Sequence, residues 1–168
     1  EIFDFTNFGS LTSLSATTLS NAPMGMKLQN NKVYITSATN WEVWDVSNPN
    51  SPSQLFTAAL PSGDTAGRAI EVNGEYVYLG TNTPALYVFQ IKSGDFSSPE
   101  QIVNSFTPTA GINRMQFRGN ILHIMTGGGY QPVDVTVKSN PVSLSVVAAF
   151  TGASNFILDG DQVISAIN

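Results

Sequence analysis

The chain has 168 residues, of which 42% are apolar, and this suits one compact domain or a tandem of very small units. No uncharged apolar run approaches the ~20 residues that span a bilayer, so we expect no membrane span. Seven basic and twelve acidic residues give a net charge of -5 without a Lys/Arg cluster, which argues against nucleic acid as a partner.

Charged residues make up only 11% of the chain, against about 25% in an average soluble domain, and Ser, Thr, Asn and Gly take their place. The absence of cysteine excludes disulfides, thiolate metal sites and cysteine nucleophiles. The sequence begins at Glu1 without a charged and apolar leader, and no Asn-x-Ser/Thr site is present. We expect a prokaryotic protein that lies outside the cell or on its surface after removal of a signal peptide.

In chain order, the sequence predicts strands and turns throughout, with no helical period. Two strand-like runs come first, at 2–5 and 14–19. A hairpin, a third run and a fourth, more polar run then follow three times, and the chain ends on a fourth hairpin. The hairpins lie at 26–35, 70–79, 115–124 and 156–165, the third runs at 42–46, 87–91 and 134–137, and the fourth runs at 54–60, 101–106 and 144–150.

The four hairpins align without a gap, and each carries a two-residue turn. The second residue of the turn is Asn30, Gly74, Gly119 or Gly160, and these residue types accept the positive φ angles of tight hairpins. The turns recur about every 40 residues, and four strands per unit of that length is the pattern of a β-propeller blade.

We therefore predict an all-β fold, a small closed β-propeller with four blades of four antiparallel strands each. The chain begins at a third strand and ends after a second strand, so the N- and C-terminal segments are expected to share one blade. In that blade, 2–5 would pair beside 162–165. The whole chain, 1–168, would form a single domain with units at about 24–66, 67–110, 111–152, and 153–168 combined with 1–23.

The alternation of the hairpin strands also predicts which side chains pack between blades, because a shift of one residue would turn them all outward. These are Met26, Leu28, Ile70, Val72, Met115, Phe117, Phe156 and Leu158, with Val33, Val77, Leu122 and Val163 beside them.

The segment from 33–35 through the run at 44–52 resembles the LVIVD-type propeller repeat, whose hallmark is an aliphatic strand that ends Asp-Val-Ser-Asn-Pro. In the other units, Gln90 and Thr136 stand in place of Asp45 and Asp4, and the Asn-Pro link is kept only at 140–141. The resemblance implies the propeller fold and no particular activity.

Few residues point to chemistry. His123 is the only histidine and stands at the position of Tyr34 and Tyr78, so we expect it to be structural. A nucleophilic triad needs a base beside a serine, and a zinc site needs several His or Cys, so we expect no catalytic residue, metal or cofactor. Asp4 and Asp45 recur at equivalent positions, which is typical of acids that close a turn and not of a pair that hydrolyses glycosides.

Three residues are candidates for contact with a ligand. Arg68 and Arg114 precede innermost strands, near the mouth of the channel, where they either grip an anion or remain solvated. Trp41 and Trp44 are three residues apart, which places them on opposite faces if they share a strand. An exposed Trp41 would stack on a sugar.

Three classes of function remain, in this order: a self-assembling structural subunit, a binding module and an enzyme. The outer runs at 14–19, 55–60 and 144–150 carry no charge, although free strand edges are normally guarded by Lys, Pro or bulges. We predict a non-catalytic secreted subunit whose partners are copies of itself and which forms an extracellular homopolymer of stacked propellers. The alternative is an extracellular propeller module that binds a glycan or a protein.

Overall fold

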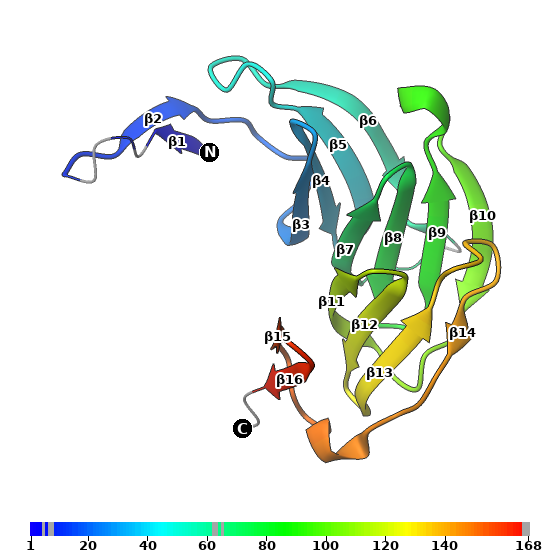
Figure 1. Cartoon of the computed structure of the whole chain (residues 1–168). Helices are drawn as coiled ribbons and strands as arrows, with labels where there is room; N and C mark the ends of the chain where they lie inside the picture. The colour runs from blue at the N-terminus through cyan, green and yellow to red at the C-terminus, as the bar shows by residue number, and fades with distance from the viewer. Residues whose placement is uncertain (5, 7–8, 62–63, 65, 166–168) are drawn as a thin grey trace.

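Three four-stranded antiparallel sheets form the body of the protein, and in each sheet the strands pair in chain order (Figure 1). The structure is a computed structural model that describes residues 1–4, 6, 9–61, 64 and 66–165. The first sheet contains β3 (Pro23–Gln29), β4 (Lys32–Ser37), β5 (Asn40–Asp45) and β6 (Ser53–Ala59). The second contains β7 (Gly67–Asn73), β8 (Tyr76–Thr81), β9 (Leu86–Gln90) and β10 (Glu100–Phe106). The third contains β11 (Ile112–Arg118), β12 (Ile121–Thr126), β13 (Gly129–Asp134) and β14 (Val142–Ser143).

A two-stranded hairpin lies at each end of the chain. The N-terminal hairpin consists of β1 (Ile2–Asp4) and β2 (Thr12–Ser15), and the C-terminal one of β15 (Phe156–Asp159) and β16 (Gln162–Ser165). Two short 3-10 turns, Lys92–Gly94 and Ala148–Phe150, complete the described secondary structure.

The two terminal hairpins do not join into one blade. β1 pairs with β2, β15 pairs with β16, and the described residues of β1 and β16 form separate sheets. Figure 1 shows the hairpins at opposite ends of an open arc of sheets. The predicted pairing of 2–5 with 162–165, and with it the closed four-bladed ring, is therefore wrong for the described residues, and Phe5 lies outside them.

The hairpin turns have the predicted backbone conformation. Asn30, Gly74, Gly119 and Gly160 have φ angles between 51° and 63°. Each is the first residue of its two-residue loop and not the second, because the preceding strand continues for one more residue, as β3 does to Gln29. The side chains after each turn alternate between the two faces of the sheet in the predicted order.

The third sheet departs most from the prediction. Its third strand is β13, at 129–134 and not 134–137, because the Asp134 carboxylate accepts the Thr136 backbone N–H at 2.8 Å and ends the strand. Asp134, and not Thr136, is thus the counterpart of Asp45. The run at 144–150 contributes only an isolated bridge between Val147 and Tyr130 and a 3-10 turn.

The core consists of layers between successive sheets, as predicted. Ile70 and Val72 pack against Tyr34 between the first and second sheets, and Met115 packs against Tyr78 between the second and third. Phe156 covers the far face of the third sheet. Met26, Leu28 and Val33 are the exceptions, because Met26 and Leu28 are exposed and Val33 is half-buried on the face that no complete sheet covers.

Candidate functional site

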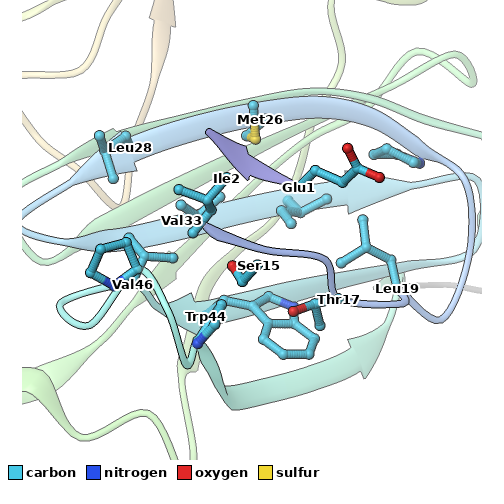
Figure 2. Close-up of a pocket in the computed structure, with 14 residues that line it drawn as sticks. Glu1, Ile2, Ser15, Thr17, Leu19, Met26, Leu28, Val33, Trp44 and Val46 are labelled. Carbon is cyan, nitrogen blue, oxygen red and sulfur yellow. The ribbon is translucent and has the colours of Figure 1, made fainter. Parts of the chain in front are cut away.

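An apolar cavity of about 790 Å³ separates the N-terminal hairpin from the first sheet (Figure 2). Its floor comes from alternate residues of three strands of that sheet, which all point to the same face. Its other side is formed by Ile2 of β1, by Ser15 at the end of β2, and by Thr17 and Leu19 in the segment that follows β2. The floor consists of Met26, Leu28, Val33, Ile35, Trp44 and Val46.

Polar groups in the cavity are few. Glu1 and Thr17 lie on its wall, and the Ser15 hydroxyl is buried without a hydrogen-bond partner within the described part of the chain. The His123 ring lies elsewhere, on β12. Across the described ranges, no three His, Asp or Glu side chains gather closely enough to hold a metal ion.

A buried carboxylate, that of Glu42 on β5, lies on the same face of the sheet as Trp44, beside the cavity floor. It receives the Trp44 indole N–H at 2.9 Å, which fixes the indole at the cavity floor, and the Ser20 backbone N–H at 3.2 Å, which fixes the segment between β2 and β3. The Asn40 and Gln54 side-chain amides donate to it at 3.0 and 3.1 Å. Burial by itself would raise the pKa of Glu42, but the hydrogen bonds from Trp44, Ser20 and Asn40 lower it overall.

Low pH is expected to lower the free energy of unfolding, because Glu42 becomes protonated. Because the pKa of the folded state lies below the ordinary 4.5, the contribution of Glu42 to stability is complete above that value and is lost as the pH falls through the lowered pKa. The free energy of unfolding, measured in urea, should fall more steeply between about pH 6 and about pH 3 for the wild type than for Glu42→Gln. Equal slopes for the two proteins would contradict this role.

The structure reverses the expected roles of the two tryptophans. Trp41 is fully buried, and the centroid of its ring lies 4.5 Å from that of Phe56 and 5.0 Å from that of Phe89. The interpretation of Trp41 as an exposed platform for a sugar is therefore wrong. Trp44 points to the opposite face of β5, as the odd spacing predicts, and is the tryptophan at the cavity.

Arg68 and Arg114 are exposed near the starts of the innermost strands β7 and β11. They are not equivalent in the repeat, because Arg68 lies at a register shift opposite β8 whereas Arg114 pairs with Met125. The structure does not bring either of them to the cavity.

His123 and the repeated aspartates have structural partners. His123 Nδ1 shares a hydrogen bond with the Tyr130 hydroxyl, and the two rings stack. Burial, and then the nearby Arg118, lower the pKa of His123. The carboxylates of Asp4 and Asp45 each accept a backbone N–H two residues ahead, at 2.8 Å, so they close turns as predicted.

The cavity itself was not predicted from the sequence. Its floor residues Met26, Leu28 and Val33 were expected to pack between blades, and they do lie on that face of the sheet. A signal was present, since 2–5 and 14–19 make only the outer half of a blade and leave the inner half of the facing sheet uncovered.

Comparison with known proteins finds the fold and no sequence family. No family model and no curated protein matches the chain. The computationally designed Ika4 protein has a TM-score of 0.67 at 16% identity, over 91% of this chain and 89% of its own. A protein from Lactobacillus plantarum has a TM-score of 0.79 at 13% identity, over 98% of this chain and 56% of its own. The N-terminal domain of Nup159 has a TM-score of 0.56 at 13% identity, over 88% of this chain and 38% of its own.

The chain thus spans most of the designed protein but little more than half of the Lactobacillus plantarum chain, and less of Nup159. At these identities the similarity concerns the fold alone, and the resemblance to the LVIVD-type repeat stays a prediction. In the described ranges, no helix is both long enough and apolar enough to cross a bilayer. The consecutive four-stranded antiparallel sheets, and the solved folds that they match, show that this chain has a β-propeller-like fold.

Proposed function

We propose that this protein is a non-catalytic structural subunit that is exported from the cell and assembles with copies of itself into an extracellular homopolymer. The observation that carries the proposal is the pair of apolar sheet faces left uncovered at the two ends of the arc. Met26 and Leu28 are exposed at one end, and Ile157 and Ile164 at the other. Large exposed apolar patches are typical of interaction sites.

The two faces differ, so a contact between them is heterologous. Such a contact leaves one free face on each side of the growing assembly, and addition continues into a fibre unless the rotation between subunits closes a ring. The low content of charged residues and the polar, uncharged outer runs support a subunit that packs side by side with others outside the cell.

Self-association is expected to depend on concentration and only weakly on salt, because few charges lie at the proposed contacts. Light scattering and electron microscopy of the purified 168-residue chain across a dilution series, in low and high salt, test this directly. We expect fibres that grow with concentration in both salts. A strictly monomeric species at high concentration in both would contradict the proposal.

The second candidate is a propeller module that binds a glycan or a protein. It is favoured by the exposed guanidinium groups of Arg68 and Arg114, which form no ion pair with the described residues and are suited to carboxylates and sulfates. Glycan arrays with the wild type and with Arg68→Ala/Arg114→Ala distinguish it, because a homopolymer subunit would give the same null result with both proteins.

A further inference from the structure

We propose that β16 of one chain pairs with β1 of a second copy, so that the C-terminal hairpin of one and the N-terminal hairpin of the other form a single four-stranded sheet. This rests on the proposed self-association and specifies the surfaces that make it. The occupant of each open face is then the opposite end of the same protein.

The strand edges carry the first argument. In each complete sheet the second strand pairs with the third, as β4 does with β5 and β8 with β9. β15 and β16 correspond to a first and a second strand, and β1 and β2 to a third and a fourth. The outer edge of β16 and the facing edge of β1 have no strand partner among the described residues. An unpaired edge is a template for another strand.

The repeat also defines the register. In the complete sheets, the residue after the hairpin loop pairs with the last residue of the third strand: Lys32 with Asp45, Tyr76 with Gln90, and Ile121 with Asp134. Gln162 and Asp4 hold these positions in the two hairpins. The antiparallel register therefore places Gln162 opposite Asp4, Val163 opposite Phe3, and Ile164 opposite Ile2 of the second copy.

The exposed fractions of equivalent residues show which faces of each copy are left uncovered. Ile70 and Met115 are 5% and 3% exposed because the preceding sheet covers them, whereas Met26, at the same position of the first sheet, is 70% exposed. Leu28 is 61% exposed. At the other end, Ile164 stands at the position of Tyr34, which packs against Ile70 and Val72, but Ile164 is 45% exposed.

The faces fit when the two hairpins join. Phe156, Leu158 and Val163 already cover the third sheet of their own chain, so the opposite face of that hairpin is free to cover another sheet. Pairing with β1 would lay Ile157 and Ile164 over Met26 and Leu28 of the second copy. The cavity beneath the N-terminal hairpin is the space that this inner half of the sheet would fill.

The curvature favours a second copy over closure within one chain. The hairpins lie at opposite ends of the arc in Figure 1. Within one chain, β16 therefore does not pair with β1, and each of the two strand edges is left for a second copy.

Disulfide trapping tests the pairing, since the wild type has no cysteine. Chains carrying Ile2→Cys are mixed with chains carrying Ile164→Cys and oxidised, and we expect a mixed disulfide dimer. The register control mixes Ile2→Cys with Gln162→Cys, which lies two residues away and should give at least about tenfold less product because its Cβ is out of reach. Equal yields from the two mixtures would overturn the proposal.

A second arm separates this pairing from other modes of association. Met26→Asp should raise the apparent dissociation constant more than about tenfold, because pairing would bury an unpaired charge. The control Val137→Asp replaces another exposed apolar residue, 58% exposed against 70% for Met26, that lies outside the proposed contact, and it should leave association unchanged. Circular dichroism verifies that both variants fold.

The outcomes distinguish this inference from the proposed function. The mixed disulfide together with a wild type that light scattering shows at a fixed small size across the dilution series would support the pairing and contradict the homopolymer. Fibres that form equally well with Met26→Asp and give no mixed disulfide would support the homopolymer and overturn the pairing. A monomeric Ile2→Cys/Ile164→Cys chain that forms its disulfide internally would overturn the pairing, and strict monomers without any disulfide would overturn both.

Discussion

Replacing Trp41 with alanine is expected to lower the free energy of unfolding by about 3–5 kcal/mol, the range for removal of a large aromatic side chain from a core. Trp41 is fully buried between the first and second sheets and contacts the rings of Phe56 and Phe89. Its loss would open a cavity between two sheets that cannot close by local relaxation. Urea denaturation followed by the fluorescence of Trp44 measures the change.

The matched control is Leu28→Ala, at a concentration where the chain is monomeric. Leu28 lies at an interface position of the repeat, but its side chain is exposed, so the variant should lose less than about 1 kcal/mol. A comparable loss in both variants would mean that Leu28 is covered within the single chain, contrary to the open arc.

Gly111→Ala is expected to lower the free energy of unfolding by about 1–3 kcal/mol, as overpacking does in a rigid core. A Cβ at Gly111 would lie 2.9 Å from the carbonyl carbon and 3.0 Å from the Cα of Asn82, both backbone atoms that cannot rotate away. Gly111 and Asn82 lie where the second and third sheets meet.

Gly127→Ala provides the comparison, because its Cβ would meet nothing nearer than the Ala110 methyl group at 3.8 Å, and its φ angle is not positive. Alanine restricts the unfolded chain more than glycine, so this variant should be unchanged or more stable by up to about 1 kcal/mol. Urea denaturation of the two variants side by side decides the point. An equally stable Gly111→Ala would show that the two sheets adjust their separation freely.

These effects follow from one architecture. Each complete sheet contributes to two apolar layers, and the first and third sheets each present an outer face that a terminal hairpin covers only in part. The stability of a single chain therefore comes from the contacts among the three complete sheets. The terminal hairpins contribute less to it, and their exposed apolar residues are available for contacts between copies.

Glu42 connects the three complete sheets to the N-terminal hairpin. Its carboxylate joins the first sheet, through Trp44, to the segment that carries the N-terminal hairpin, through the Ser20 backbone. Protonation of Glu42 at low pH is therefore expected to lower the stability of the protein and also to loosen the position of the N-terminal hairpin. We expect pairing between copies to weaken at low pH for the same reason.

Much of the fold follows from local sequence. The alternation at 70–79 and 115–124 placed Ile70, Val72 and Met115 in the layers between sheets, because a side-chain period of two leaves one choice of face once a single apolar set is known. Asn30 and Gly74 marked the hairpins because few other residues accept their positive φ angles. The turn-closing role of Asp4 and Asp45 was also evident from their recurrence.

Other features were decided only by the tertiary structure. Local alternation puts Trp41 and Trp44 on opposite faces but does not say which face is covered, since that depends on the neighbouring sheet. The angle between sheets is set by side chains that meet from distant parts of the chain, so the phase of the two terminal hairpins suggested a closed ring where the structure has an open arc. The exposure of Met26, against the burial of Ile70 and Met115 at the same position of the repeat, follows from that angle and from no property of the residue itself.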